Sequence, residues 1–137
     1  MSNEKIAILL KKAELVIDKF TNQILAPYDL THTQFKILMT LYRSPDTSVR
    51  QADIEKKFGM TNPTVTGIIH NMEKKNLVKR VENPNDKRSK FIVLTPQARQ
   101  MEARMHELSE QREKQIRRNL TDEEYELLII LLKKVLE

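Results

Sequence analysis

Residues 62–94 have the sequence NPTVTGIIHNMEKKNLVKRVENPNDKRSKFIVL. The Asn-Pro pair predicts a helix over residues 63–75 with Asn62 as its N-cap, because proline is favoured in the first turn and apolar residues then recur at helical spacing. Residues 77–81 and 91–94 are two predicted strands on either side of a turn-rich, basic segment, which predicts a β-hairpin with a long tip. The sequence therefore predicts a helix followed directly by a hairpin.

A shorter helix precedes this one. Residues 51–58 span about two helical turns, and Gly59 can adopt the left-handed conformation that ends a helix. Two short helices joined by a turn that contains glycine form a helix-turn-helix. A hairpin directly after such a motif is a wing, so these residues predict a winged helix-turn-helix.

Further helices flank this motif. Apolar residues at helical spacing cover residues 5–26, and Thr31 begins another helix with a capping box. A long, mostly polar helix is predicted from Thr95 to about Arg118, and Thr121 opens a terminal helix with a second capping box. The predicted fold class is mainly α with a small β-hairpin wing.

The outer helices predict a homodimer. Residues 127–132 are all apolar and point to every side of the terminal helix, and the apolar stripe of residues 5–26 is also long. A small single core cannot bury both surfaces, whereas a second copy of the chain can. We therefore expect dimerisation helices in residues 1–28 and 98–137, and a winged helix-turn-helix domain in residues 29–97.

The positive charge is concentrated in one segment. The net charge is +5, and residues 74–90 carry seven basic and two acidic side chains, so the rest of the chain is neutral overall. A lysine-rich loop in contact with solvent is one explanation. A concentrated positive patch is also the feature expected of a protein that binds a polyanion such as DNA.

Composition excludes several classes of function. There is no cysteine, and the three histidines (His32, His70 and His106) lie far apart, so we expect no disulfide, no metal site and no cofactor. The sequence contains no recognisable catalytic constellation and no glycine-rich phosphate loop. We therefore expect that the protein is not an enzyme. The longest apolar run has six residues, whereas a membrane span needs about 20. The N-terminus lacks the apolar run of a signal peptide, so we expect a soluble, cytoplasmic protein.

The outer face of helix 63–75 is small and polar, as a helix that enters a major groove about 12 Å wide should be. Gly67 costs about 1 kcal/mol relative to alanine in the middle of a helix, so a neighbouring helix or a DNA strand is expected to approach its backbone. His70 is either a contact to DNA or a solvated polar residue. In the hairpin, the carboxylate of Asp86 can orient the guanidinium of Arg88 for the negative minor groove, unless both are simply exposed.

Three motifs together resemble the MarR family of bacterial regulators: PTVTGIIHNMEKKNLVKR at 63–80, NPNDKR at 83–88 and VLT at 93–95. The resemblance implies a transcriptional regulator, more often a repressor than an activator, that binds an inverted-repeat operator as a homodimer. It implies that helix 63–75 lies in the major groove and wing 82–90 in the minor groove. With the residues above, it defines thirteen predicted interface residues: Asn62, Pro63, Thr64, Thr66, Gly67, His70, Asn71, Lys74, Lys79, Asp86, Lys87, Arg88 and Lys90.

The chain departs from the family at several positions. The family often has a basic residue where Gly67 stands, glycine at Asn76, aspartate at Asn83 and a capping threonine at Arg50. The resemblance also implies a small effector, often aromatic and anionic, bound where the dimerisation helices meet the winged domain. Candidates for its pocket are equally compatible with ordinary core or surface positions: Lys12, Val16, Phe20, Ile37, Tyr42 and Met101.

A winged-helix module that binds only other proteins is the main alternative to a DNA-binding regulator. Such a module has no need for a net charge of +5 concentrated in one hairpin and the end of one helix. Binding to duplex DNA that weakens with salt would separate the two functions.

Overall fold

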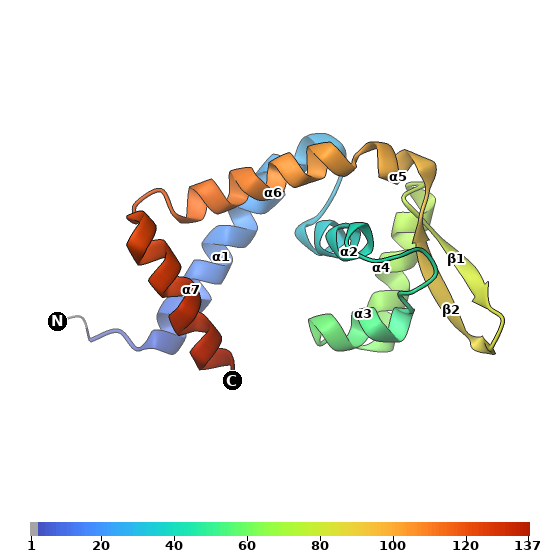
Figure 1. Ribbon diagram of the computed structural model, residues 1–137, viewed down its shortest axis with the longest axis horizontal. Helices are drawn as coiled ribbons and strands as arrows, with labels where there is room; N and C mark the ends of the chain where they lie inside the picture. The colour runs from blue at the N-terminus through green and yellow to red at the C-terminus, as the bar shows by residue number, and fades with distance from the viewer. Residues whose placement is uncertain (1–2) are drawn as a thin grey trace.

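The computed structural model describes residues 3–137 and consists of a winged-helix part beside an arm of long helices (Figure 1). The prediction of a mainly α fold with one small hairpin is confirmed. The elements in chain order are α1 (Ile6–Leu25), the short 3₁₀ helix η1 (Ala26–Tyr28), α2 (His32–Tyr42), α3 (Gln51–Phe58), α4 (Asn62–Lys74), β1 (Val78–Asn83), β2 (Asp86–Leu94), α5 (Pro96–Gln100), α6 (Glu102–Ile116) and α7 (Asp122–Leu136).

The core lies in the winged-helix part. Phe35, Ile37 and Leu38 of α2 are almost completely buried, together with the inner face of α4 and with Ile92 of β2. Met105 and Leu108 extend this core into α6, which packs against both α1 and α2. Burial of these side chains therefore joins the winged-helix part to the helical arm.

Both predicted capping boxes are present. The Thr31 hydroxyl accepts a hydrogen bond from the backbone N–H of Gln34, and the Thr31 N–H donates to the Gln34 side chain. Thr121 and Glu124 exchange the same pair of bonds at the start of α7. These local bonds pair backbone N–H groups that a helix terminus leaves unsatisfied.

The N-cap of α4 differs from the prediction: it is Thr61 and not Asn62. Thr61 has extended backbone angles, and its hydroxyl accepts from the N–H of Thr64. Asn62 is the first helical residue, and its side-chain amide donates to Glu55 instead. Proline is also tolerated one position further in, because the N–H it lacks would be unpaired there as well.

Two further boundaries differ from the prediction. The helix predicted from Thr95 is interrupted at Met101, whose N–H bonds Ala98 three residues back, and α6 continues beyond it. The wing has no long loop, because β1 and β2 pair from Val78 and Leu94 almost to the tip. The Asn83 side chain accepts from the N–H of Asn85 and so closes a tight turn.

The connection between α4, the hairpin and α5 is formed by Thr95. Its buried hydroxyl donates to the carbonyl of Asn76 at 2.7 Å and accepts from the N–H of Ala98, so it also caps α5. Asn76 has a φ of +58°, in the left-handed region that favours glycine. Asparagine is among the residues that tolerate this conformation best.

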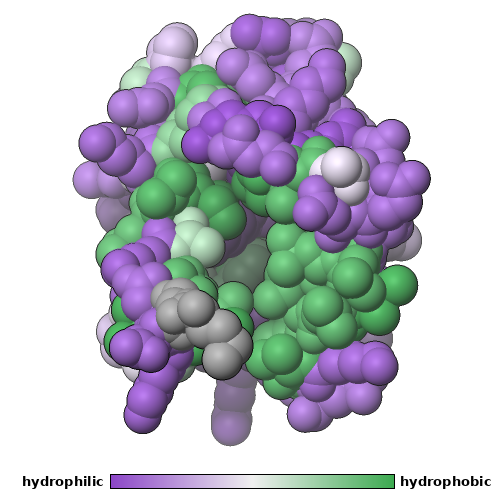
Figure 2. All heavy atoms as spheres, turned by 90° about the vertical axis from the view of Figure 1, so that its left-hand side faces the viewer, coloured by the Kyte–Doolittle hydropathy of each residue, from purple (hydrophilic) through white to green (hydrophobic). Residues whose placement is uncertain are grey.

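Large apolar side chains remain exposed on α1 and α7. Ile6, Ile8, Leu9, Leu10, Leu15 and Val16 of α1 and Leu127, Leu128, Ile130, Leu131, Val135 and Leu136 of α7 are each at least 37% exposed. Figure 2 shows apolar surface on both sides of a hollow on this face of the molecule. No residue of α7 is buried, so in the single chain the terminal helix has no core of its own.

Among residues 3–137, no helix combines the length and the hydrophobicity needed to cross a lipid bilayer.

Candidate nucleic-acid interface

The outer face of α4 is presented to solvent because its inner face is buried. Val65, Ile69 and Met72 are completely buried against the core. Gly59, with a φ of +62°, ends α3 and sets the turn that places α3 beside α4. All thirteen predicted interface residues are exposed on α4 and the hairpin, which lie next to each other (Figure 1).

Gly67 faces open space. A Cβ atom placed on it would meet no heavy atom from elsewhere in the described chain within 4 Å. The explanation that a neighbouring helix approaches this backbone is therefore wrong for the single chain. The other expectation, that a DNA strand approaches Gly67, stays a prediction.

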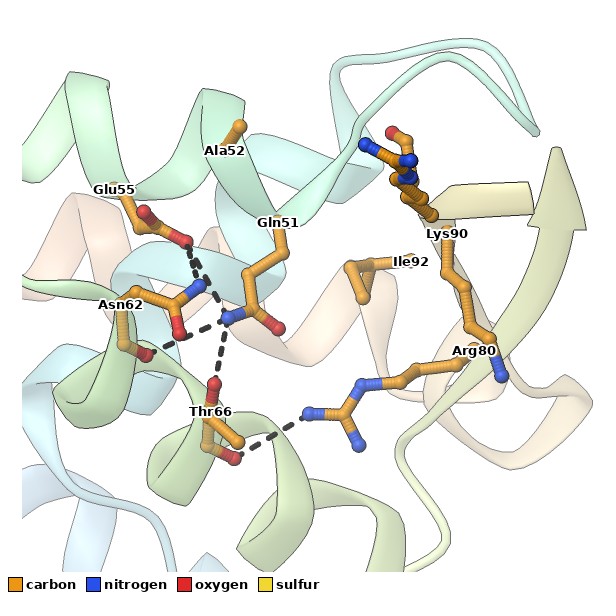
Figure 3. A pocket seen from close by; sticks show the side chains of 10 residues that line it. Gln51, Ala52, Glu55, Asn62, Thr66, Arg80, Lys90 and Ile92 are labelled. Carbon is orange, nitrogen blue, oxygen red and sulfur yellow. Dashed lines mark hydrogen bonds between the residues drawn. The ribbon is translucent and has the colours of Figure 1, made fainter. Parts of the chain in front are cut away.

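A polar cavity of about 420 Å³ separates α3 and α4 from the wing (Figure 3). On the helix side of the cavity, the Gln51 amide of α3 donates to the Thr66 hydroxyl of α4 at 2.8 Å, and Glu55 accepts from Asn62 at 3.0 Å. Arg80 donates to the backbone carbonyl of Thr66 and forms an ion pair with Glu73. Two of the predicted interface residues, Asn62 and Thr66, thus have partners in the chain itself.

Asp86 acts on the backbone of Arg88. Its carboxylate accepts from the Arg88 N–H at 3.0 Å, and we find no contact from the carboxylate to the guanidinium within residues 3–137. The prediction that Asp86 orients the guanidinium directly is therefore wrong in this structure. Asp86 instead fixes the turn from which the Arg88 side chain extends.

The seven basic residues of segment 74–90 fall into two groups. Lys75 bonds Asp29 and Gln34, and Arg80 bonds Glu73, so these two cations are neutralised within the chain. The other five have exposed side chains whose cationic groups have no partner among the described residues: Lys74, Lys79, Lys87, Arg88 and Lys90. These five are the basic members of the predicted interface set.

Arg50 is the N-cap residue of α3, and its partner there is Asp53. Arginine has no acceptor for a backbone N–H, but Asp53 accepts from the Arg50 N–H and from its guanidinium. These bonds hold the pKa of the Asp53 carboxyl below its usual range. Asp53 thus supplies its own half of a capping box, whereas the Arg50 side chain accepts no hydrogen bond at this helix start.

The six predicted effector-pocket residues are not all brought together. Lys12, Val16 and Phe20 line a cavity of about 260 Å³ between α1 and the end of α6, beside Arg112. Ile37, Tyr42 and Met101 lie outside this lining. Their positions belong to the core and its edge: Ile37 is fully buried, Met101 packs against the core, and Tyr42 donates its hydroxyl to Ala98. Burial raises the pKa of Tyr42 to about 12, so this hydroxyl remains a donor.

Sequence reasoning missed three residues of this surface: Gln51, Thr61 and Arg80. Thr61 could have been found, because threonine with another polar residue three positions later is an ordinary N-cap pattern. Gln51 and Arg80 reach α4 from other elements, across fifteen and fourteen residues of chain. No local pattern signals contacts of that kind.

The fold and the exposed polar helix beside a basic hairpin define a winged helix-turn-helix protein. The MarR family model matches residues 30–90. The multiple antibiotic resistance protein MarR of Salmonella typhimurium is 30% identical over 120 residues, which cover 87% of this chain and 82% of that protein. The chain belongs to the MarR family.

Two other similar proteins agree with this assignment. The homoprotocatechuate degradative operon repressor of Escherichia coli is 28% identical over 132 residues, covering 96% of this chain and 88% of the repressor. The crystal structure of the S. aureus MepR–DNA complex matches with a TM-score of 0.89 and 27% identity, covering 98% of both chains.

Replacement of Gly67 tests whether packing within the chain offsets the helix-propensity cost of this glycine. Gly67→Ala should raise the free energy of unfolding by up to about 1 kcal/mol, because the added methyl group meets open space and alanine favours the helix. Gly59→Ala is the matched control and should lower it by about 1–2 kcal/mol, since alanine is strained at positive φ. Urea unfolding at one fixed protein concentration measures both. A loss of stability in Gly67→Ala would show that α4 is packed at this position.

Proposed function

We propose that this protein is a transcriptional repressor that binds a specific double-stranded DNA operator as a homodimer, with α4 in the major groove and the wing in the minor groove. The observation that carries the proposal is the group of five exposed cations without partners on α4 and the hairpin. Phosphates would supply the negative charge that the chain itself does not provide there. The DNA complex of MepR and the name of the E. coli operon repressor support the same function.

The thirteen predicted interface residues would make different kinds of contact with DNA. Thr64, Thr66, His70 and Asn71 lie on the exposed face of α4, where their side chains can reach base edges. Asn62 and Pro63, at the start of the helix, and Gly67 allow the DNA backbone to approach closely. Arg88, supported by Asp86, would enter the minor groove, and Lys74, Lys79, Lys87 and Lys90 would contact phosphates.

A homodimer accounts for the exposed apolar surface of α1 and α7. The twelve large apolar side chains exposed there would be covered by a second copy of the chain. The proposed domain organisation is a winged DNA-binding domain over residues 29–97 and a dimerisation region over residues 1–28 and 98–137. Residues 1–2 lie outside the described structure. Two-fold symmetry of the protein requires an inverted-repeat operator.

A small anionic effector would fit the cavity between α1 and α6. Val16 and Phe20 supply apolar lining, while Lys12 and Arg112 place positive charge at its edge. Ligand sites commonly combine an apolar lining with a few charged groups. An effector there would lie on the helices that hold the two copies together, where it could alter the spacing of the two DNA-binding domains.

This function requires no catalysis, since the family consists of regulators and not of enzymes. A bacterial regulator of this kind works in the cytoplasm, where the DNA is. The five cations without partners favour a DNA-binding function over a purely protein-binding one. In a protein–protein interface, removing these cations from water would cost free energy.

The salt dependence of binding should identify the phosphate contacts. Lys74→Ala, Lys87→Ala and Lys90→Ala should each weaken specific and scrambled duplexes alike and lower the slope of log K against log[salt] by about 1. Lys75→Ala and Lys114→Ala are controls and should leave the slope unchanged, because Lys75 is paired within the chain and Lys114 lies on α6. Fluorescence anisotropy measures all of them. A flat salt titration of the wild-type protein would remove DNA as the partner.

The wing tip should carry one strong contact. Arg88→Ala should lose on the order of 1–3 kcal/mol of operator binding, more than any single lysine change in the wing, and Arg88→Lys should restore only part. Asp86→Ala should show a smaller loss, because the turn at Arg88 is loosened. Asp86→Asn, which keeps an acceptor for that N–H, should lose less still. If Arg88→Ala binds as the wild type does, the wing tip is only a solvated turn.

The dimer should depend on the apolar face of α7. In Leu131→Glu a charge replaces a side chain that is 48% exposed in the single chain, so the fold of each copy should change little. Its burial in a dimer interface would cost several kcal/mol, on the order expected for an unpaired buried ion. Sedimentation at micromolar concentration should show monomers that bind the inverted repeat poorly, whereas Lys114→Glu should remain dimeric. A dimeric Leu131→Glu protein would place the interface elsewhere.

A further inference from the structure

The amide of Gln51 has a defined orientation. Its nitrogen lies 2.8 Å from the Thr66 hydroxyl, 3.3 Å from the Glu55 carboxylate and 3.5 Å from the Asn62 carbonyl (Figure 3). A carboxylate and a carbonyl can only accept hydrogen bonds. The side of the amide that faces them must therefore be the NH₂ group and not the oxygen.

This orientation determines the role of the Thr66 hydroxyl. An amide nitrogen donates and cannot accept, so the Thr66 oxygen accepts from Gln51. The hydroxyl hydrogen then remains for another partner. Thr21 and Thr40 use theirs on the carbonyl four residues earlier in their helices. For Thr66 that carbonyl belongs to Asn62 and is approached by Gln51, and we find no bond from the Thr66 hydroxyl to any acceptor in the described chain.

We propose that Gln51 is a positioning residue that makes Thr66 a hydrogen-bond donor toward DNA, and that it thereby selects a base pair with an acceptor at that point of the major groove. The proposal rests on the function proposed above. The acceptors available there are the purine N7, guanine O6 and thymine O4, whereas the amino groups of adenine and cytosine are donors. Gln51 would therefore influence sequence preference through Thr66 and without a base contact of its own.

Thr64 provides the contrast on the same helix face. Its hydroxyl lies 2.9 Å from the hydroxyl of Thr61. Two hydroxyl groups can exchange donor and acceptor roles by rotation, so Thr64 can present either to a base. Thr66 differs because the Gln51 amide can only donate: one lone pair of the Thr66 oxygen stays occupied, and the hydroxyl hydrogen has no acceptor in the described chain.

Removal of the amide has a specific consequence. In Gln51→Met a side chain of similar length without a donor replaces it, and the Asn62 carbonyl becomes available. The Thr66 hydroxyl can then donate to that carbonyl, as Thr21 and Thr40 do to theirs, and it presents only lone pairs to the DNA. Glutamate is a poorer test, because a new negative charge would weaken binding to every duplex.

The experiment uses the full-length protein and the duplex that it selects from a random pool. Each base pair is exchanged in turn, purines are replaced by 7-deaza analogues that lack the N7 acceptor, and thymines by 4-thiothymine, whose sulfur accepts weakly. Fluorescence anisotropy compares the wild type with Gln51→Met, Thr66→Val, Thr64→Val and the double variants. Thermal unfolding confirms that the variants remain folded.

The wild type should show one position in each half-site where loss of the acceptor weakens binding about two- to tenfold, the range of one hydrogen bond. Gln51→Met and Thr66→Val should both lose the penalty at that position and keep the preferences elsewhere. Gln51→Met should have no further effect in the Thr66→Val protein, whereas its effect should persist in Thr64→Val.

Three results would overturn the proposal. If Gln51→Met keeps the full preference of the wild type, or if its effect adds to that of Thr66→Val, then Gln51 does not act through the hydroxyl. An equal loss on all duplexes would likewise reduce Gln51 to a structural residue. Failure of the proposed function is distinct: the wild type itself would then select no duplex and show no salt-dependent binding.

Discussion

Burial of one face of α4 is the constraint on which the rest of the structure depends. Val65, Ile69 and Met72 are completely removed from solvent, and this fixes the rotation of the helix about its axis. The opposite face, with Thr66, Gly67 and its polar neighbours, is then exposed to solvent. A helix can present recognition residues at a defined angle only if its other face is anchored in this way.

The wing and the helical arm are attached to this anchored helix through few residues. Thr95 is buried and bonds the end of α4 through Asn76, while it also caps α5. Met105 and Leu108 then carry the same core into α6. The arm, α4 and the hairpin are therefore joined by one continuous set of packed side chains and one buried hydroxyl.

The surface of the chain has two contrasting areas. One end exposes apolar side chains of α1 and α7, whereas α4 and the hairpin expose cations without partners (Figures 1 and 2). Exposure of either area to solvent has a free-energy cost. Exposed apolar surface orders water, and neighbouring like charges repel one another. The two areas call for different partners, a second copy of the chain for the first and a polyanion for the second.

Spacing along the chain was enough to predict most of the helices, the presence of the hairpin, both capping boxes and the exposed face of α4. The sequence also located the seven basic residues of segment 74–90, but the ion pairs of Lys75 and Arg80, which leave five cations without partners, came from the structure. Only the tertiary structure decided that Thr61 caps α4, that Asp86 holds the backbone of Arg88, and that Ile37 belongs to the core. It alone joined Gln51 to Thr66. Periodicity states which face of a helix is buried, but not which atoms of other elements that helix meets.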